Sequence, residues 1–60
     1  MFYIIKTVQG YRYWWNENGC KWEGLIDNAE QFSFTQCETI YSRINTNKEK
    51  QITIKKINYD

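Results

Sequence analysis

The chain has 60 residues, a formal net charge of +1, no histidine and no proline, and 18% of it is aromatic. A chain of this length buries only about 60% of its unfolded surface, so we expect a single domain over residues 1–60. The small net charge argues against both a strongly basic nucleic-acid binder and an acidic mimic. No stretch approaches the roughly 20 apolar residues that a membrane helix requires, so we expect no membrane partner.

Charge is divided unevenly along the chain. Residues 17–38 contain five acidic side chains and one basic side chain, whereas residues 39–60 contain five basic and two acidic ones. Such a layout can steer a charged partner or favour self-association, although accidental segregation on a solvated surface is the simpler interpretation. A core this small rarely supplies more than about 3–5 kcal/mol of folding stability without a disulfide, a metal or a second subunit. We therefore also expect a homodimer.

The two cysteines are expected to be free thiols. Residues 1–6 lack the basic and apolar regions of an export signal, which predicts a cytoplasmic protein in a reducing compartment. We expect Cys20 and Cys37 to be small buried hydrophobic side chains. Two thiols without histidine fall short of four zinc ligands, so no metal and no cofactor are expected.

The first part of the chain predicts two strands joined by a tight turn. Residues 1–8 are rich in β-branched and aromatic side chains, with apolar residues on both faces of the strand. Gln9 and Gly10 offer the backbone conformation of a two-residue hairpin. Residues 11–15 then alternate, so that one face is wholly aromatic and carries Tyr11, Tyr13 and Trp15, while Arg12 and Trp14 point the other way.

A second hairpin and a short helical turn are expected next. The Asn18-Gly19 pair is the strongest turn signal in the chain, and residues 20–23 after it predict a short third strand. Asp27 and Glu30 have the spacing of a capping box, which predicts a single helical turn ending near Phe32.

The last third predicts a helix followed by a strand. Thr35 and Glu38 repeat the capping-box spacing and open a helix to Ile44, after which the run 45–47 ends it. Residues 51–55 alternate as a strand with Ile52 and Ile54 toward the core, and Ile57 is out of phase. The predicted fold is α+β, with the order β-β-β-α-β. It has a small antiparallel or mixed sheet of three or four strands and one helix packed on one face.

Nothing in the chain indicates catalysis. Histidine, the commonest acid–base residue, is absent, and Gly10, Gly19 and Gly24 are isolated turn glycines rather than a phosphate-binding loop. Cys37 lies in the first turn of the predicted helix, where a thiol can be activated, but it lies on the apolar face. We therefore expect no catalytic residues and no enzyme activity.

The high number of aromatic side chains is the feature of the sequence that points to a function. One helix covers a single face of a small sheet, so some rings must lie on the open face, with Trp14 the first candidate. Exposed Trp and Tyr beside Arg are typical of a protein-binding hot spot, which predicts a partner-binding set of Arg12, Tyr13, Trp14, Trp15 and Trp22.

Three other interpretations of the rings remain open. They could stack the bases of a single-stranded nucleic acid with help from Lys48, Lys50, Lys55 and Lys56. The low net charge makes this a less favoured partner. Alternatively, a dimer interface could sequester a small nucleotide signal, or the rings could simply pack the core and its edges.

Five segments together carry a resemblance: the Tyr-Ile-Ile-Lys strand 3–6, the aromatic hairpin strand 11–15, the Ala-x-x-Phe turn 29–32, the capped helix 35–44 and the Lys/Ile strand 52–57. In this combination the chain resembles a group of small phage-encoded host-interference or anti-defence proteins. The resemblance implies stoichiometric inhibition of a host protein or an antiviral-defence protein in the host cytoplasm, often by a dimer. The leading hypothesis is therefore a phage inhibitor that acts by protein–protein binding.

Overall fold

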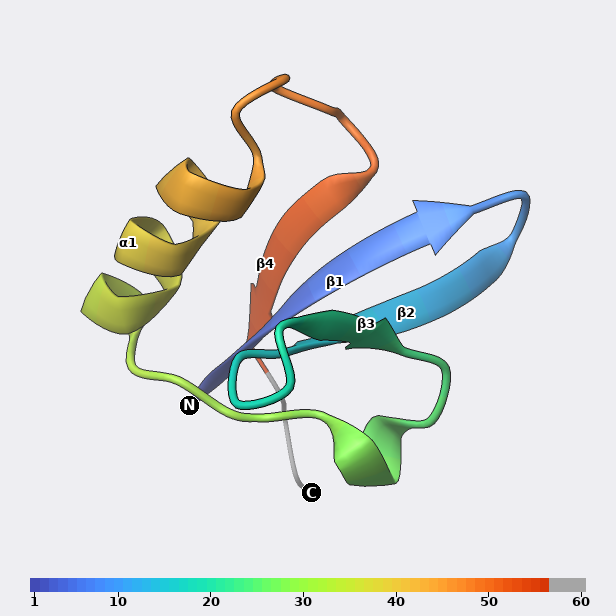
Figure 1. Cartoon of the computed structure of the whole chain (residues 1–60), viewed down its shortest axis with the longest axis horizontal. Helices are drawn as coiled ribbons and strands as arrows, with labels where there is room; N and C mark the ends of the chain where they lie inside the picture. The colour runs from blue at the N-terminus through green and yellow to red at the C-terminus, as the bar shows by residue number, and fades with distance from the viewer. Residues whose placement is uncertain (57–60) are drawn as a thin grey trace.

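The computed structural model describes residues 1–56 and confirms a small α+β fold with the order β-β-β-α-β (Figure 1). Its four strands form one antiparallel sheet in the order β3-β2-β1-β4. The elements are β1 (Phe2–Val8), β2 (Tyr11–Asn16), β3 (Lys21–Glu23), the 3-10 turn η1 (Ile26–Asn28), α1 (Phe34–Ile44) and β4 (Ile52–Lys56). The expectation for Ile57 and the ring of Tyr59 lie outside the described residues. Within residues 1–56, no helix has the length and apolar character needed to cross a membrane.

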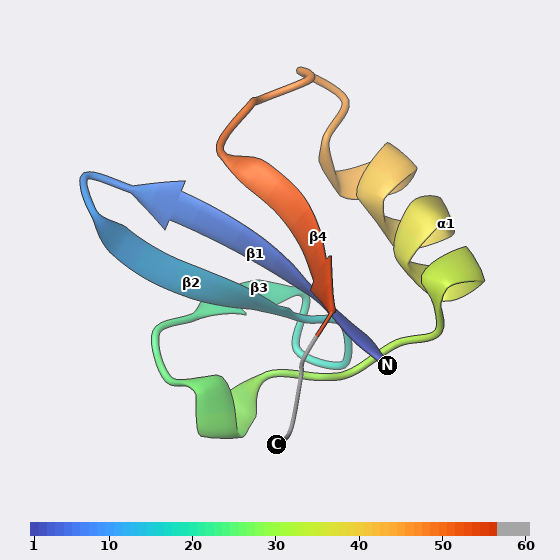
Figure 2. The same cartoon turned by 180° about the vertical axis from the view of Figure 1, so that it is seen from behind.

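The first hairpin forms as expected. Val8 pairs with Tyr11, and both residues between them have positive φ, 51° at Gln9 and 84° at Gly10. Positive φ at both central positions suits the primed turns that match the twist of paired strands. β1 and β2 therefore extend together as a long two-stranded ribbon (Figures 1 and 2).

The second turn differs from the expectation in its detail. The residue with positive φ is Cys20, at 51°, rather than Gly19. The Asn16 side chain accepts a hydrogen bond from the Gly19 amide at 2.8 Å, and the left-handed residue that ends the turn is one position after Gly19. Cys20 is exposed there and β3 begins at Lys21, so the prediction of a buried Cys20 is wrong, whereas that of a buried Cys37 is confirmed.

Neither predicted capping box forms. The helix α1 has a capping box two residues earlier than expected, and the turn near Asp27 has none. Ser33, not Thr35, caps α1, because its side chain accepts the Gln36 amide while the Gln36 side chain accepts the Ser33 amide. The turn near Asp27 is a 3-10 turn without a side-chain cap. Glu30 instead accepts the Asn18 amide at 2.7 Å, which ties this segment to the second hairpin.

The core lies between α1 and one face of the sheet, which we call the helix face. Its buried side chains come from three strands, the helix and the segment before the helix: Ile4, Trp15, Ile52, Phe32, Cys37 and Ile40. Ile4 and Cys37 are fully buried. Phe32 is fixed by two backbone hydrogen bonds of 2.8 Å to Phe2, which extend the sheet beyond the end of β2.

The opposite face, which we call the loop face, is not open as expected. Tyr3 and Ile5 point to it from β1, yet they are only 5% and 6% exposed. The segment of residues 24–31 lies against this face: η1 contacts β2, and the Gln31 side chain donates to the Tyr3 hydroxyl. Figures 1 and 2 show α1 and the green η1 turn well apart, with the strands between them.

Candidate binding surface

An aromatic strip lies on the part of the helix face beyond α1. The strand register aligns Lys6 with Tyr13, Val8 with Tyr11 and Trp15 with Trp22, and all of these side chains point to the same face as Ile4. α1 packs on the β1–β4 side of the sheet, and Val8 and Tyr11 remain 40% and 70% exposed. We define the aromatic strip as Lys6, Val8, Tyr11, Tyr13 and Trp22.

The strip contains a shallow groove of about 260 Å³, lined by Lys6, Val8, Tyr13 and Trp22. Trp22 is held by the buried Trp15, whose ring meets it edge to face with centroids 5.2 Å apart. The Lys6 ammonium lies 5.8 Å from the centroid of the Trp22 ring. The groove therefore combines apolar walls with one cation, and its Trp22 ring is packed against the core.

Part of the loop between α1 and β4 lies beside the groove. A second hollow of about 350 Å³ shares Lys6 and Val8 with the groove and is completed by Thr7, Gln9, Glu49 and Gln51. Glu49 lies 3.9 Å from the Lys6 ammonium, and its two neighbours, Lys48 and Lys50, are exposed. The charged side chain that this loop contributes to the hollow is therefore the Glu49 carboxylate, which is paired with Lys6.

The five residues predicted to bind a partner do not share one surface. Tyr13 and Trp22 belong to the aromatic strip, and Trp15 is 8% exposed in the core. Arg12 and Trp14 point to the loop face, where Trp14 is half-buried. The expectation that Trp14 points opposite to Tyr13 and Trp15 is thus confirmed, but the exposed aromatic surface lies on the helix face.

Three members of the strip, Lys6, Val8 and Tyr11, were absent from the predicted partner-binding set. A two-residue hairpin that closes at Val8 and Tyr11 places even-numbered residues of β1 on the same face as odd-numbered residues of β2. Counting this register across Gln9 and Gly10 would have placed Lys6 beside Tyr13. The signal was therefore present in the hairpin length.

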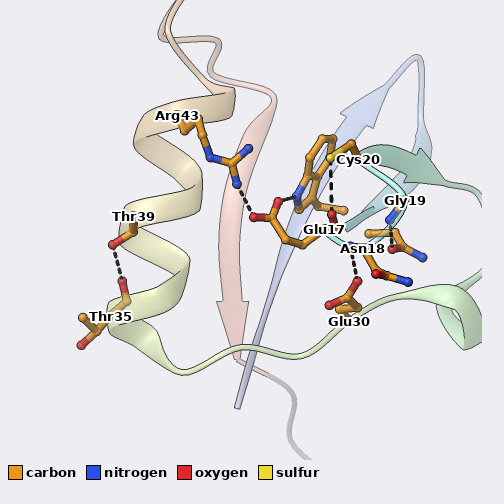
Figure 3. A network of polar contacts seen from close by, with 10 residues as sticks. Glu17, Asn18, Gly19, Cys20, Glu30, Thr35, Thr39 and Arg43 are labelled. Atoms are coloured by element: carbon orange, nitrogen blue, oxygen red, sulfur yellow. Dashed lines mark hydrogen bonds and ion pairs between the residues drawn. The ribbon is translucent and has the colours of Figure 1, made fainter.

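A polar network joins the second hairpin to the helix (Figure 3). Glu17 accepts hydrogen bonds from the Trp15 indole at 2.9 Å and from the Arg43 guanidinium of α1. These two bonds, with Arg43 the larger cause, hold the pKa of Glu17 below its ordinary value. The network borders a hollow of about 510 Å³ lined by Glu17, Glu30, Gln31, Phe32, Thr35, Gln36, Thr39 and Ile40. Because both carboxylates are already hydrogen-bonded, we assign this network to stabilisation of the fold.

The Glu17 contact predicts a pH-dependent stability. A carboxylate with a lowered folded-state pKa stabilises the fold above its unfolded-state pKa, about 4.3, and this contribution is lost as pH falls through the folded-state value. We expect the melting temperature of wild type to exceed that of Glu17→Gln at neutral pH, and the difference to shrink between about pH 5 and pH 3. Circular dichroism melts across this range measure it.

The matched control for this prediction is Glu38→Gln, which removes one carboxylate from an exposed position of α1, the helix that carries Arg43, and leaves both hydrogen bonds to Glu17 in place. We expect a smaller loss of stability at neutral pH from the control. An equal difference from wild type at every pH for Glu17→Gln would contradict the role assigned to the Glu17 charge.

The thiols offer little chemistry. Burial raises the pKa of the Cys37 thiol, so the reactive thiolate is disfavoured there. Cys20 is exposed in the turn, and its thiol donates to the Glu17 carbonyl at 3.4 Å. Within residues 1–56, no group of three or more His, Cys, Asp or Glu side chains is arranged to hold a metal ion.

The described surface thus offers a groove with apolar walls, one lysine and a Trp22 ring packed against the core. Its geometry is suited to binding an apolar side chain next to a negative charge. Comparisons with protein-family models, with curated proteins and with solved structures found no match for this chain.

Proposed function

We propose that this chain is a small non-catalytic binding protein that inhibits a host protein or an antiviral-defence protein by stoichiometric binding in the cytoplasm. The observation that carries the proposal is the aromatic strip, which exposes Tyr11 and Val8 beside Tyr13 and Trp22. Tyr, Trp and a cation grouped around a small pocket are the composition of a protein-binding hot spot. The resemblance to phage-encoded proteins supplies the class of target.

The rigidity of the strip supports this function. Tyr13 and Trp22 have few rotatable bonds, and Trp22 rests on the core residue Trp15. Ordering long side chains on binding costs about 0.5–1.5 kcal/mol each, so rings that are already fixed lose less of the interaction energy. A chain of 60 residues can therefore bind tightly through a small surface.

Single-stranded nucleic acid is less well supported. Of the four lysines expected to contact phosphates, Lys48 and Lys50 are exposed in the loop between α1 and β4, Lys55 points to the loop face, and Lys56 pairs with Phe2 at the far end of β1. Glu49 also places a carboxylate next to Lys6. Phosphate contacts dominate such affinity, and these positions do not form one track.

The test compares two neighbouring residues that point to opposite faces. Wild type, Tyr13→Ala and Arg12→Ala are immobilised after circular dichroism confirms that each folds, and partners are recovered from a bacterial lysate and identified by mass spectrometry. Calorimetry then measures affinity and stoichiometry for the recovered protein. We expect Tyr13→Ala to lose about 2 kcal/mol, roughly 30-fold in affinity, and Arg12→Ala to bind as wild type does.

Equal binding by all three proteins would remove the strip as the site. Titration of wild type with an oligonucleotide at two salt concentrations, followed by tryptophan fluorescence, tests the nucleic-acid alternative. Quenching at low salt that disappears at high salt would contradict the protein-binding proposal in favour of nucleic acid.

A further inference from the structure

An exposed apolar loop lies on the opposite side of the same sheet edge from the groove. Leu25 and Ile26 follow β3 directly and are 66% and 48% exposed. Asp27, next in the chain, is also exposed. We call residues 24–28 the acidic loop. It presents two aliphatic side chains beside a negative charge, on a protein with a small core.

The groove has the complementary chemistry. Its walls are the apolar surfaces of Val8, Tyr13 and Trp22, and Lys6 stands among them. The ion pair from Lys6 to Glu49 is long, at 3.9 Å, and partly exposed, so it leaves much of the attraction of the lysine available. An aliphatic side chain followed by an aspartate fits this arrangement.

We propose that a second copy of this chain occupies the groove, and that the acidic loop of each copy supplies the Leu25 or Ile26 side chain that fills it. The inference rests on the proposed function in that both use the aromatic strip. Self-association and partner binding then compete, so the inhibitor is stored with its binding surface covered.

The geometry of the β3 edge allows a closed dimer. β3 is an edge strand of the sheet formed by residues 1–56; it carries Trp22 of the groove, and the acidic loop follows it. The groove lies on the helix face, whereas η1 lies on the loop face. A two-fold axis along this edge turns one copy over relative to the other, which brings each loop beside the groove of the other copy. Such a reciprocal contact is the self-complementary interface of a symmetric dimer.

The pairing also provides what the small monomer lacks. Burial of exposed Leu25, Val8 and Tyr11 removes apolar surface from water at about 25 cal/mol per Å², which adds to a core limited by chain length. The contact places Asp27 of the loop beside Lys6 of the groove. We therefore expect dimerisation to weaken as salt screens the Asp27 contact.

The experiment uses two variants that damage opposite halves of the contact. Leu25→Ser removes the anchor at a position that is 66% exposed, so the fold is spared, and Tyr13→Ala damages the groove. Sedimentation velocity over a concentration series measures dimerisation of each. We expect wild type to dimerise and each variant to do so at least about tenfold more weakly.

Mixing the two variants provides the decisive comparison. In the mixed dimer the intact loop of Tyr13→Ala meets the intact groove of Leu25→Ser, so one of the two contacts is restored. The other contact carries both changes, but the second change adds little where the first has already broken the contact, since residues that touch are not additive. We therefore expect the mixture to associate more tightly than either variant alone. A wild type that stays monomeric at every concentration, or a mixture no tighter than its components, would overturn the proposal.

The two proposals fail separately. Leu25→Ser keeps its groove, so it is expected to bind the foreign partner at least as well as wild type while dimerising poorly. Dimerisation that depends on Leu25 and Tyr13, without any captured partner, would support this inference and contradict the proposed function. If the wild type remains monomeric but binds a partner through Tyr13, the proposed function is supported and the dimer proposal is contradicted.

Discussion

Replacement of Trp15 by alanine is expected to leave the chain largely unfolded at 25 °C. Trp15 is 8% exposed, packs in the core with Ile4, Phe32 and Cys37, and supports the Trp22 ring. Truncation of a buried Trp costs about 3–5 kcal/mol, and a core of this size supplies about the same total. Far-UV circular dichroism during urea titration measures the outcome, and we expect no cooperative transition for the variant.

The matched control is Trp14→Ala, the neighbouring indole on the loop face. Trp14 is half-buried and lies outside the core cluster, so its loss is expected to shift the urea midpoint while leaving a cooperative transition. Trp15→Phe adds a second comparison, because it keeps a ring in the core but removes the indole hydrogen bond to Glu17. A Trp15→Ala variant as stable as Trp14→Ala would contradict the assignment of Trp15 to the core.

Local sequence patterns predicted the elements well. Alternation over residues 11–15 correctly separated Trp14 from Tyr13 and Trp15, and Gln9 and Gly10 correctly predicted the first hairpin. These features depend on neighbouring residues, which a single sequence displays directly. The order β-β-β-α-β follows from them.

Competing local signals account for the errors at the turns. Ser33 and Thr35 both begin a capping-box pattern, and the structure uses the earlier one, with Gln36 rather than Glu38 as the partner. Glu30 had the spacing for a local cap with Asp27, but it bonds the Asn18 amide, twelve residues away. A pattern shows which side chains can cap; tertiary contacts decide which of them do so.

The binding surface depended on contacts distant in sequence. The burial of Tyr3 and Ile5 under residues 24–31 could not be read from β1, since it requires the loop to fold back on the sheet. With Tyr3 and Ile5 covered, the most exposed aromatic side chain of the two strands is Tyr11, on the helix face. The predicted set was therefore split between two faces, although Tyr13 and Trp22 belong to the strip.

Replacement of Asn45 by alanine is expected to destabilise the fold by about 2–3 kcal/mol, because it leaves partly buried backbone groups without partners. Asn45 was expected only to end the helix, yet it is 5% exposed and makes two side-chain hydrogen bonds. Its Oδ1 accepts the Glu49 amide at 2.8 Å, and its Nδ2 donates to the Glu49 carbonyl at 3.1 Å. Its φ of −109° is not left-handed, and the left-handed residue of the loop is Lys48.

These two bonds hold Glu49, which lies in the hollow beside the groove. Residues 48–50 connect Asn45 to the start of β4, and the Glu49 carboxylate lies 3.9 Å from the Lys6 ammonium. We therefore expect Asn45→Ala to weaken both dimerisation and partner binding even at temperatures where the variant is folded. Urea titration measures the stability, and hydrogen exchange at the Glu49 amide shows whether its protection is lost.

Asn47→Ala is the matched control, because the same side chain is removed from an exposed position of the same loop. Surface substitutions of this kind change stability by no more than about 0.5 kcal/mol, so Asn47→Ala should unfold, exchange and bind as wild type does. Equal behaviour of the two variants would mean that the loop is held by its backbone turn alone, through bonds such as that from the Lys48 amide to the Asn45 carbonyl at 3.2 Å. Retained protection of the Glu49 amide in Asn45→Ala would contradict the proposed role of this side chain in the same way.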